Sequence, residues 1–287
     1  MSPESQPSEA LPSRRRRAPR GGRHRGDESF LLPPGSPTLV LAVPGPARPA
    51  AAEPAAELAR LVELEHTGQP ARVGYLEGEE ANLRTVLAGL RPDPDDPDEL
   101  AAVVVPLSTG PDPALDAALD DAVRAATAGG PPHAVAAEPL GPHPLIAEAL
   151  HDRLADAGLA RADRIRLMTM VTAASGVIVA TPGDATAVRQ AEVTGVLLAS
   201  RLAAPVFTAS LNDEASVKAA AEQLRAAGAT SIALAPHVVG PEPDTDRVPS
   251  AAATVGCAYS APLGAHPAVA RLAALRYVEA LSMALAD

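Results

Sequence analysis

The sequence predicts an α/β protein made of two similar halves in tandem, each with a four-stranded parallel sheet flanked by helices. Short apolar runs that suit buried strands alternate with stretches of helical length, which is typical of parallel βαβ units. The same order of elements occurs twice along the 287 residues, and two short motifs recur at corresponding places. A repeat of this kind favours duplication of one folding unit over a single larger sheet.

The first half opens with the apolar run at 38–43, which ends at Pro44-Gly45-Pro46. A continuous apolar run of this length is typical of a strand that is buried on both faces. The Pro- and Asp-rich segment at 91–99 predicts a loop. The other elements expected in this half are strands at 73–76, 101–107 and 134–140 and helices at 51–65, 79–90, 114–126 and 144–157.

The second half repeats this order. The motif Pro139–Pro144 (PLGPHP) recurs as Pro262–Pro267 (PLGAHP), and the turn Val43-Pro44-Gly45 corresponds to Thr181-Pro182-Gly183. We therefore expect two domains of ordinary size, at 37–160 and 174–287, after a tail at 1–36. The elements expected in the second half are strands at 177–180, 205–210, 231–239 and 257–261 and helices at 184–202, 213–227 and 267–285.

The composition is that of an acidic protein with few aromatic side chains. Aromatic residues make up 2% of the chain and Trp is absent, so bases would find few aromatic platforms on which to stack. The net charge of −11 disfavours an anionic partner such as DNA. Seven Arg nevertheless lie within residues 1–30. We expect a disordered, basic, solubilising tail at 1–36 and no nucleic-acid partner.

Targeting and redox features are few. No apolar run reaches the length of about 20 residues that spans a bilayer. The arginines Arg14–Arg17 are not followed by the apolar segment of a secretion signal. The single Cys257 excludes an intramolecular disulfide and any site built from several cysteines. These observations favour a cytoplasmic protein without membrane contact, and they leave its oligomeric state open.

Ligands of parallel sheets bind outside the carboxyl ends of the strands, so the residues that follow each strand are the site candidates. Gly45, Ser108 and Gly110 are the small residues expected to contact a bound ligand. The polar or titratable candidates at this edge are Glu77, Asp112 and His143 in the first half and Asp184, Asp213, His237 and His266 in the second.

The order of these motifs resembles the sirohydrochlorin chelatases of the class II chelatase fold. The resemblance is carried by Tyr75-Leu76-Glu77, by Pro106-Leu107 followed by Gly110 and Asp116, and by the Pro-Leu-Gly-x-His-Pro motif. It extends over residues 37–284 and implies two fused flavodoxin-like halves, as in long family members. It also implies insertion of cobalt or ferrous iron, as a substrate, into a tetrapyrrole for sirohaem or cobalamin synthesis. Glu77 matches the family's acidic residue near the metal.

The sequence departs from the family at its histidines. Pro44 stands where the family has a metal-binding His, and Asp112 stands at the place of the second His. Metal insertion needs a group that accepts pyrrole protons and ligands that hold the ion, and proline can do neither. We expect Glu77 and Asp112 to be the catalytic carboxylates and Glu77, Asp112 and His237 to be the metal ligands. His143 and His266 each precede a helix, where a cap is the expected role.

Three functions fit these observations. The chain could be a chelatase with altered ligands, which would act as a lyase. It could be a non-catalytic relative that binds a tetrapyrrole or a metal, or a regulatory scaffold that engages a partner through its basic tail. The missing histidines favour the second function, whereas the family resemblance favours the first.

Overall fold

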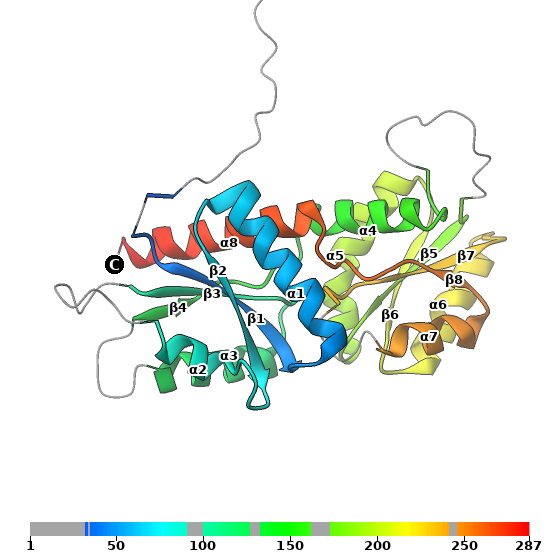
Figure 1. Cartoon of the computed structure of the whole chain (residues 1–287). Coiled ribbons are helices and arrows are strands. Elements are labelled where there is room, and N and C mark those ends of the chain that lie inside the picture. The colour runs from blue at the N-terminus through cyan, green and yellow to red at the C-terminus, as the bar shows by residue number, and fades with distance from the viewer. Residues whose placement is uncertain are drawn as a thin grey trace, which may run out of the picture.

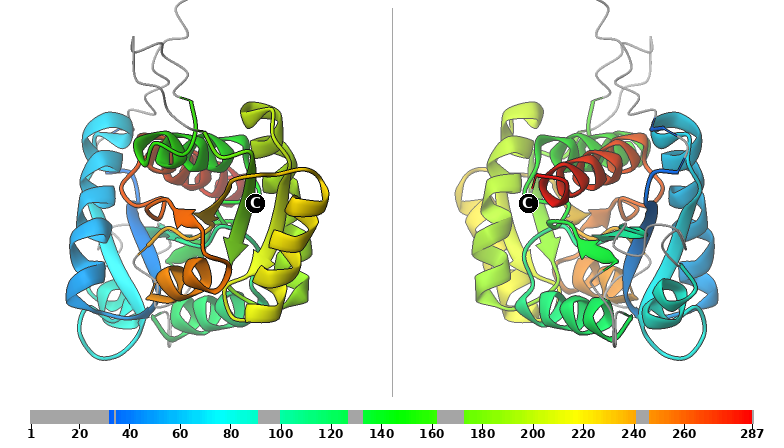
Figure 2. Two further views of the ribbon diagram at one scale, coloured as in Figure 1. Left: turned by 90° about the vertical axis from the view of Figure 1, so that its right-hand side faces the viewer. Right: turned by 90° about the vertical axis from the view of Figure 1, so that its left-hand side faces the viewer.

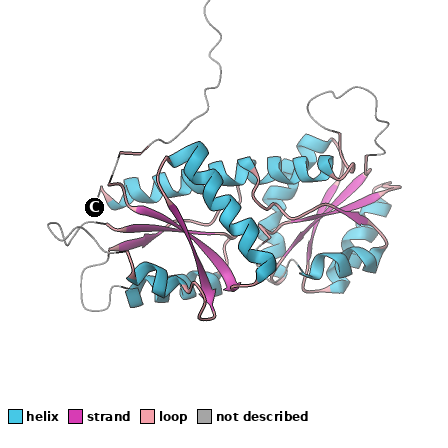
Figure 3. Cartoon of the chain, in the orientation of Figure 1, coloured by secondary structure: helices cyan, strands magenta, loops and turns pink. Residues whose placement is uncertain are grey.

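The computed structural model describes residues 32–33, 35–90, 100–126, 133–161, 173–240 and 246–286. It confirms the predicted fold class, with two all-parallel four-stranded sheets (Figures 1 and 3). The strand orders, β2-β1-β3-β4 and β6-β5-β7-β8, are equivalent. The strands are β1 (Thr38–Pro46), β2 (Ala71–Glu77), β3 (Ala102–Pro106), β4 (Ala134–Ala136), β5 (Gly176–Thr181), β6 (Val206–Ser210), β7 (Ile232–Pro236) and β8 (Ala258–Tyr259).

The predicted helices are present with shifted ends, and one helix was not predicted. The helices are α1 (Pro49–Val62), α2 (Leu83–Ala88), α3 (Pro113–Ala126), α4 (Pro144–Asp156), α5 (Ala185–Leu202), α6 (Glu214–Ala226), α7 (Val248–Val255) and α8 (Pro267–Ala284). A π-helical turn, Glu63–Thr67, extends α1. The extra helix, α7, spans only eight residues and directly follows a Pro-rich segment that is typical of a loop. None of the helices in the described ranges could span a bilayer.

The predicted loop at 91–99 and most of the predicted tail at 1–36 lie outside the described residues. Within the tail range, Leu32 already contacts the folded body. Its backbone N–H donates to the carbonyl of Thr67, and its carbonyl accepts from Nε2 of Gln69.

The last helix of each half packs on the other half. Helix α4 belongs to the first half in sequence but packs against α5 and β7, whereas α8 packs against α1, β3 and β4 (Figure 1). The two exchanged helices also contact one another along one side of the molecule (Figure 2). Hydrophobic periodicity shows that a helix has an apolar face, but it does not show which sheet that face covers.

The exchange produces one hydrophobic core that is shared by both halves. This core includes Leu41 from β1, Leu150 from α4, Val179 from β5 and Tyr277 from α8. Tyr277 is fully buried, and its hydroxyl donates to the carbonyl of Pro37 at the start of the first sheet. The opposite face of each sheet has its own smaller core, covered by α2 and α3 in the first half and by α6 and α7 in the second.

Candidate binding cavity between the two halves

A cavity of about 480 Å³ lies between the two halves, at the carboxyl ends of both sheets. Each half contributes residues from the end of its first strand or the turn that follows, the residue after its third strand and the start of a helix. This is the edge at which parallel sheets bind ligands. The lining residues discussed below are Pro44, Leu107, Ser108, Thr109, Gly110 and Asp112 from the first half and Thr181, Pro182, Asp184 and His237 from the second.

Two aspartates at the cavity cap helices that begin there. Oδ1 of Asp112 accepts from the backbone N–H groups of Ala114 and Leu115 at the start of α3. Oδ1 of Asp184 accepts likewise from Thr186 and Ala187 at the start of α5. These backbone hydrogen bonds lower the pKa of the Asp184 carboxyl. One oxygen of each exposed carboxylate is therefore engaged with a helix end, which leaves the other for a ligand.

His237 is the buried titratable residue of the cavity wall. Its side chain is almost completely buried, and burial lowers its pKa to about 4, so the imidazole is neutral near pH 7. Nδ1 lies 3.4 Å from Oγ1 of Thr109 and 3.3 Å from Oγ1 of Thr181. Nε2 is buried and has no hydrogen-bond partner within the described part of the chain. An unsatisfied buried polar atom in a native fold calls for an explanation, such as a bound water or ligand.

Six residues were predicted as ligand contacts, catalytic carboxylates or metal ligands, and the structure brings four of them to this cavity and leaves two outside it. Ser108, Gly110, Asp112 and His237 line it. Gly45 is buried near the end of β1, where the strand register shifts, and has a positive φ of 83°, a conformation that glycine adopts readily. Glu77 is exposed and lies at the end of β2, opposite Pro46 of β1.

The three predicted metal ligands do not meet. Within the described ranges, no group of three or more His, Cys, Asp and Glu side chains could hold a metal ion. The strand order explains this: Glu77 follows the edge strand β2, on the far side of β1 from the strand that precedes Asp112. His237 is buried with its Nδ1 between two threonines, whereas Asp112 is exposed on the α3 cap.

Two threonines around His237 were not predicted as site residues. Thr109 belongs to the loop after β3, and Thr181 ends β5. The sequence did hold a signal for them. Aligning the halves on Pro106 and Pro236 places His237 opposite a leucine, which is an unusual exchange for two copies of one buried position.

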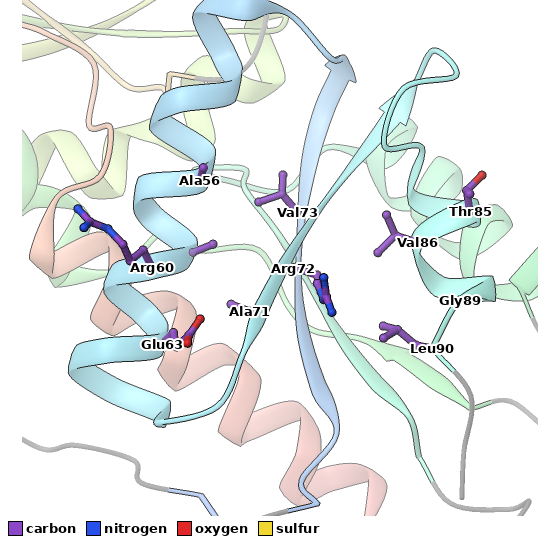
Figure 4. Close-up of a pocket in the computed structure, with 11 residues that line it drawn as sticks. Ala56, Arg60, Glu63, Ala71, Arg72, Val73, Thr85, Val86, Gly89 and Leu90 are labelled. Carbon is purple, nitrogen blue, oxygen red and sulfur yellow. The ribbon is translucent and has the colours of Figure 1, made fainter. Parts of the chain in front are cut away.

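A second hollow, of about 620 Å³, lies over the edge strand β2 between α1 and α2 (Figure 4). Its charged lining residues are Arg60, Glu63 and Arg72. Arg60 is paired with Glu57 on its own helix, and the lining contains no histidine or cysteine. This hollow is on the outer edge of the first sheet, so it does not receive side chains from both halves.

Among known protein families, one has a model that matches the first half of the chain. Residues 38–157 match the model of the family described as CbiX. The first half is therefore similar to the CbiX family over most of its length. The predicted resemblance to the sirohydrochlorin chelatases is thereby confirmed, and the equivalent second sheet fits the two-half form.

Solved structures support the same fold. The sirohydrochlorin chelatase SirB from Bacillus subtilis subspecies spizizenii, crystallised in complex with cobalt, superposes with a TM-score of 0.63. The match covers 88% of this chain and 98% of SirB at 15% sequence identity, which shows a shared fold.

Two further matches reach a TM-score of only 0.33 and support no argument. They are a LacI family transcriptional regulator from Arthrobacter sp. FB24 (14% identity, covering 78% of this chain and 75% of that one) and a bifunctional methylenetetrahydrofolate dehydrogenase/cyclohydrolase from Thermoplasma acidophilum (12% identity, covering 88% and 90%). No curated protein matches this sequence.

Proposed function

We propose that this CbiX-type protein binds a tetrapyrrole in the cavity between its halves and handles a divalent metal, cobalt or ferrous iron, for that macrocycle. The observation that carries the proposal is the position of the cavity. It lies at the carboxyl ends of both sheets of a chelatase fold, and both halves contribute to its wall. The cytoplasmic steps of sirohaem or cobalamin synthesis are the setting in which such a protein would act.

The side chains in the cavity favour binding over insertion. Insertion requires a base for two pyrrole protons and ligands that release a desolvated ion. Pro44 and Pro182 occupy the equivalent first turns and offer neither, while Asp112 has one oxygen engaged in a helix cap. We therefore propose that the chain holds its tetrapyrrole firmly and inserts metal weakly or not at all. Asp112 and, at the outer end of the same edge, Glu77 are the candidate proton acceptors.

Binding can be tested with a variant that fills the cavity. Gly110 lines the cavity, and a Cβ added to it meets no atom within 4 Å, so the backbone leaves room for a side chain to start there. Fluorescence titration with sirohydrochlorin or uroporphyrin should show binding to the wild type, at least tenfold weaker binding to Gly110→Phe, and unchanged binding to Gly110→Ala. Absence of wild-type binding, or equal affinity in Gly110→Phe, would contradict the proposal.

A further inference from the structure

A buried polar cluster joins the two halves at the cavity. It consists of Thr109 from the first half and Thr181 and His237 from the second. The hydroxyl of Thr109 donates to the backbone carbonyl of His237 over 2.8 Å, and both threonine Oγ1 atoms lie near Nδ1 of the ring. All three residues are at least nine-tenths buried.

The internal repeat allows each residue of this cluster to be compared with its counterpart in the other half of the chain. The N–H of Leu107 donates to the carbonyl of Ala42, and the N–H of His237 donates to the carbonyl of Ala180. Because Ala42 and Ala180 pair with the corresponding prolines of the third strands, Leu107 is the counterpart of His237.

The two threonines also have apolar counterparts. Thr181 follows Ala180 as Val43 follows Ala42, and both lie on the central strand of their sheet. Thr109 corresponds to Val239, because the residues before them, Ser108 and Val238, accept equivalent backbone hydrogen bonds from the Pro-Leu-Gly motifs. Val43, Leu107 and Val239 are all fully buried in the shared core. The fold therefore needs no polar group at these positions, and the polar cluster calls for another explanation.

The hydrogen bond from Thr109 to the carbonyl of His237 favours one tautomer of the imidazole. The single hydroxyl proton of Thr109 goes to the carbonyl of His237, so its oxygen can only accept from the ring. In the tautomer in which Nδ1 donates to Thr109, Nε2 carries a lone pair, whereas a Thr181 hydroxyl that donated to Nδ1 would place the ring hydrogen on Nε2. Nε2 has no partner among the residues that the structure describes, and His237 forms part of the cavity wall. A neutral imidazole oriented through its other nitrogen is the usual form of a histidine that ligates a metal.

We propose that Nε2 of His237 is the axial ligand of a metal that is already held by a tetrapyrrole in this cavity. The inference rests on the proposed tetrapyrrole binding and deepens it. The described residues contain no group of side chains that could hold a free ion, so the other ligands must come from elsewhere. The four ring nitrogens of the macrocycle supply them, and one protein nitrogen then suffices. Imidazole suits both cobalt and iron. Because Nε2 itself is covered, ligation requires a small shift of the neighbouring cavity wall.

The test compares three probes: metal-free uroporphyrin, its iron(III) complex and its cobalt complex. His237→Leu introduces the residue found at the equivalent position, so the fold should tolerate it, and His237→Gln is a second variant that keeps a polar side chain. His133→Leu is the matched control, since His133 precedes β4 at the opposite end of the sheet and does not line the cavity. Circular dichroism verifies the fold of each variant.

We expect the wild type and His133→Leu to bind the iron and cobalt complexes with the Soret shift of a nitrogen ligand. Both His237 variants should bind these complexes at least tenfold more weakly, without that shift, and added imidazole should restore the shift. Their affinity for metal-free uroporphyrin should stay within twofold of wild type. An unchanged spectrum in His237→Leu would overturn the axial role while leaving tetrapyrrole binding intact. Failure of the wild type to bind all three probes would overturn the proposed function itself.

Discussion

Arg153 and Arg276 make reciprocal hydrogen bonds between the two halves. Arg153 on α4 donates through Nε and Nη2 to the carbonyl of Leu263, at 2.9 and 2.7 Å, and Arg276 on α8 donates through Nε to the carbonyl of Pro139 at 2.8 Å. Both arginines are the tenth residue of their helix. Each exchanged helix therefore holds the Pro-Leu-Gly motif that precedes the other exchanged helix.

Loss of one arginine should destabilise both halves together. Arg153→Ala leaves the carbonyl of Leu263 without its charged donor, which we expect to lower the free energy of unfolding by about 1.5–3 kcal/mol. Urea denaturation should still show one transition, because the exchanged helices couple the halves. Arg60→Ala, which removes an exposed pair with Glu57, should change stability by less than about 1 kcal/mol. Two separate transitions in Arg153→Ala would contradict the coupling.

The proposed division at 37–160 and 174–287 can be tested by cutting the chain. A fragment that ends at residue 161 lacks α8, which covers β3, β4 and α1, and its own α4 has no α5 on which to pack. We expect this fragment and the fragment from 173 onward to aggregate or self-associate when expressed singly, because each exposes a large apolar surface. Co-expression should give a stable one-to-one complex on size-exclusion chromatography. Two monomeric fragments with cooperative unfolding would show that the exchange is dispensable.

Tyr277 should make the protein sensitive to alkaline pH. Burial raises the pKa of its phenol to about 12 in the folded state, above the unfolded value of about 10. The folded state therefore holds this proton more tightly, and the resulting stability is fully present below pH 10 and is lost as pH rises through 12. Tyr277→Phe should be less stable near neutral pH by about 1 kcal/mol, since the carbonyl of Pro37 loses its donor.

The same substitution should flatten the stability profile between pH 10 and 12, and thermal unfolding at several pH values measures this. Tyr259→Phe, at an exposed site, is the control. An equally steep alkaline loss in Tyr277→Phe would assign the effect to other groups.

The close approach of two loops in the first half should make Gly141 intolerant of a side chain. A Cβ at Gly141 would overlap the backbone carbonyl oxygen of Thr109, which cannot move without displacing a partner of His237. We expect Gly141→Ala to lower stability by about 1–3 kcal/mol. Gly110→Ala, in the same loop as Thr109 but facing open space, should be neutral. Equal melting temperatures for the two variants would contradict this packing.

The sequence was informative where local pattern decides the structure. The apolar run at 38–43 and the repeated Pro-Leu-Gly motif located both sheets, because each feature depends on neighbouring residues. The helix exchange could not be predicted, since the apolar faces of α4 and α8 fit either sheet. The sequence correctly predicted that Glu77 and Asp112 lie at the same edge of the sheet. Their separation along that edge depends on the strand order, which local sequence patterns do not reveal. Thr181 was missed because its motif was interpreted only as a copy of Val43-Pro44-Gly45.

Restoring the family's histidines should create metal insertion that the wild type performs weakly or not at all. The double variant Pro44→His with Asp112→His returns an imidazole to both positions where the family has one, and both positions line the cavity. Imidazole accepts protons near neutral pH and binds cobalt and iron, which carboxylates do less well. The rate of cobalt insertion into sirohydrochlorin, followed by absorbance, should rise at least tenfold over the wild type.

The fold should tolerate the change at Asp112, although this residue caps α3. In this chain His143 and His266 already cap helices, each accepting through Nδ1 from a backbone N–H two residues later. A histidine at 112 can cap α3 in the same way, and its Nε2 then stays available for the metal. Asp213→His, at the cap of α6 and outside the cavity, controls for the exchange of a capping residue. If the double variant binds the tetrapyrrole but inserts no more cobalt than Asp213→His, the missing histidines are not what limits this chain.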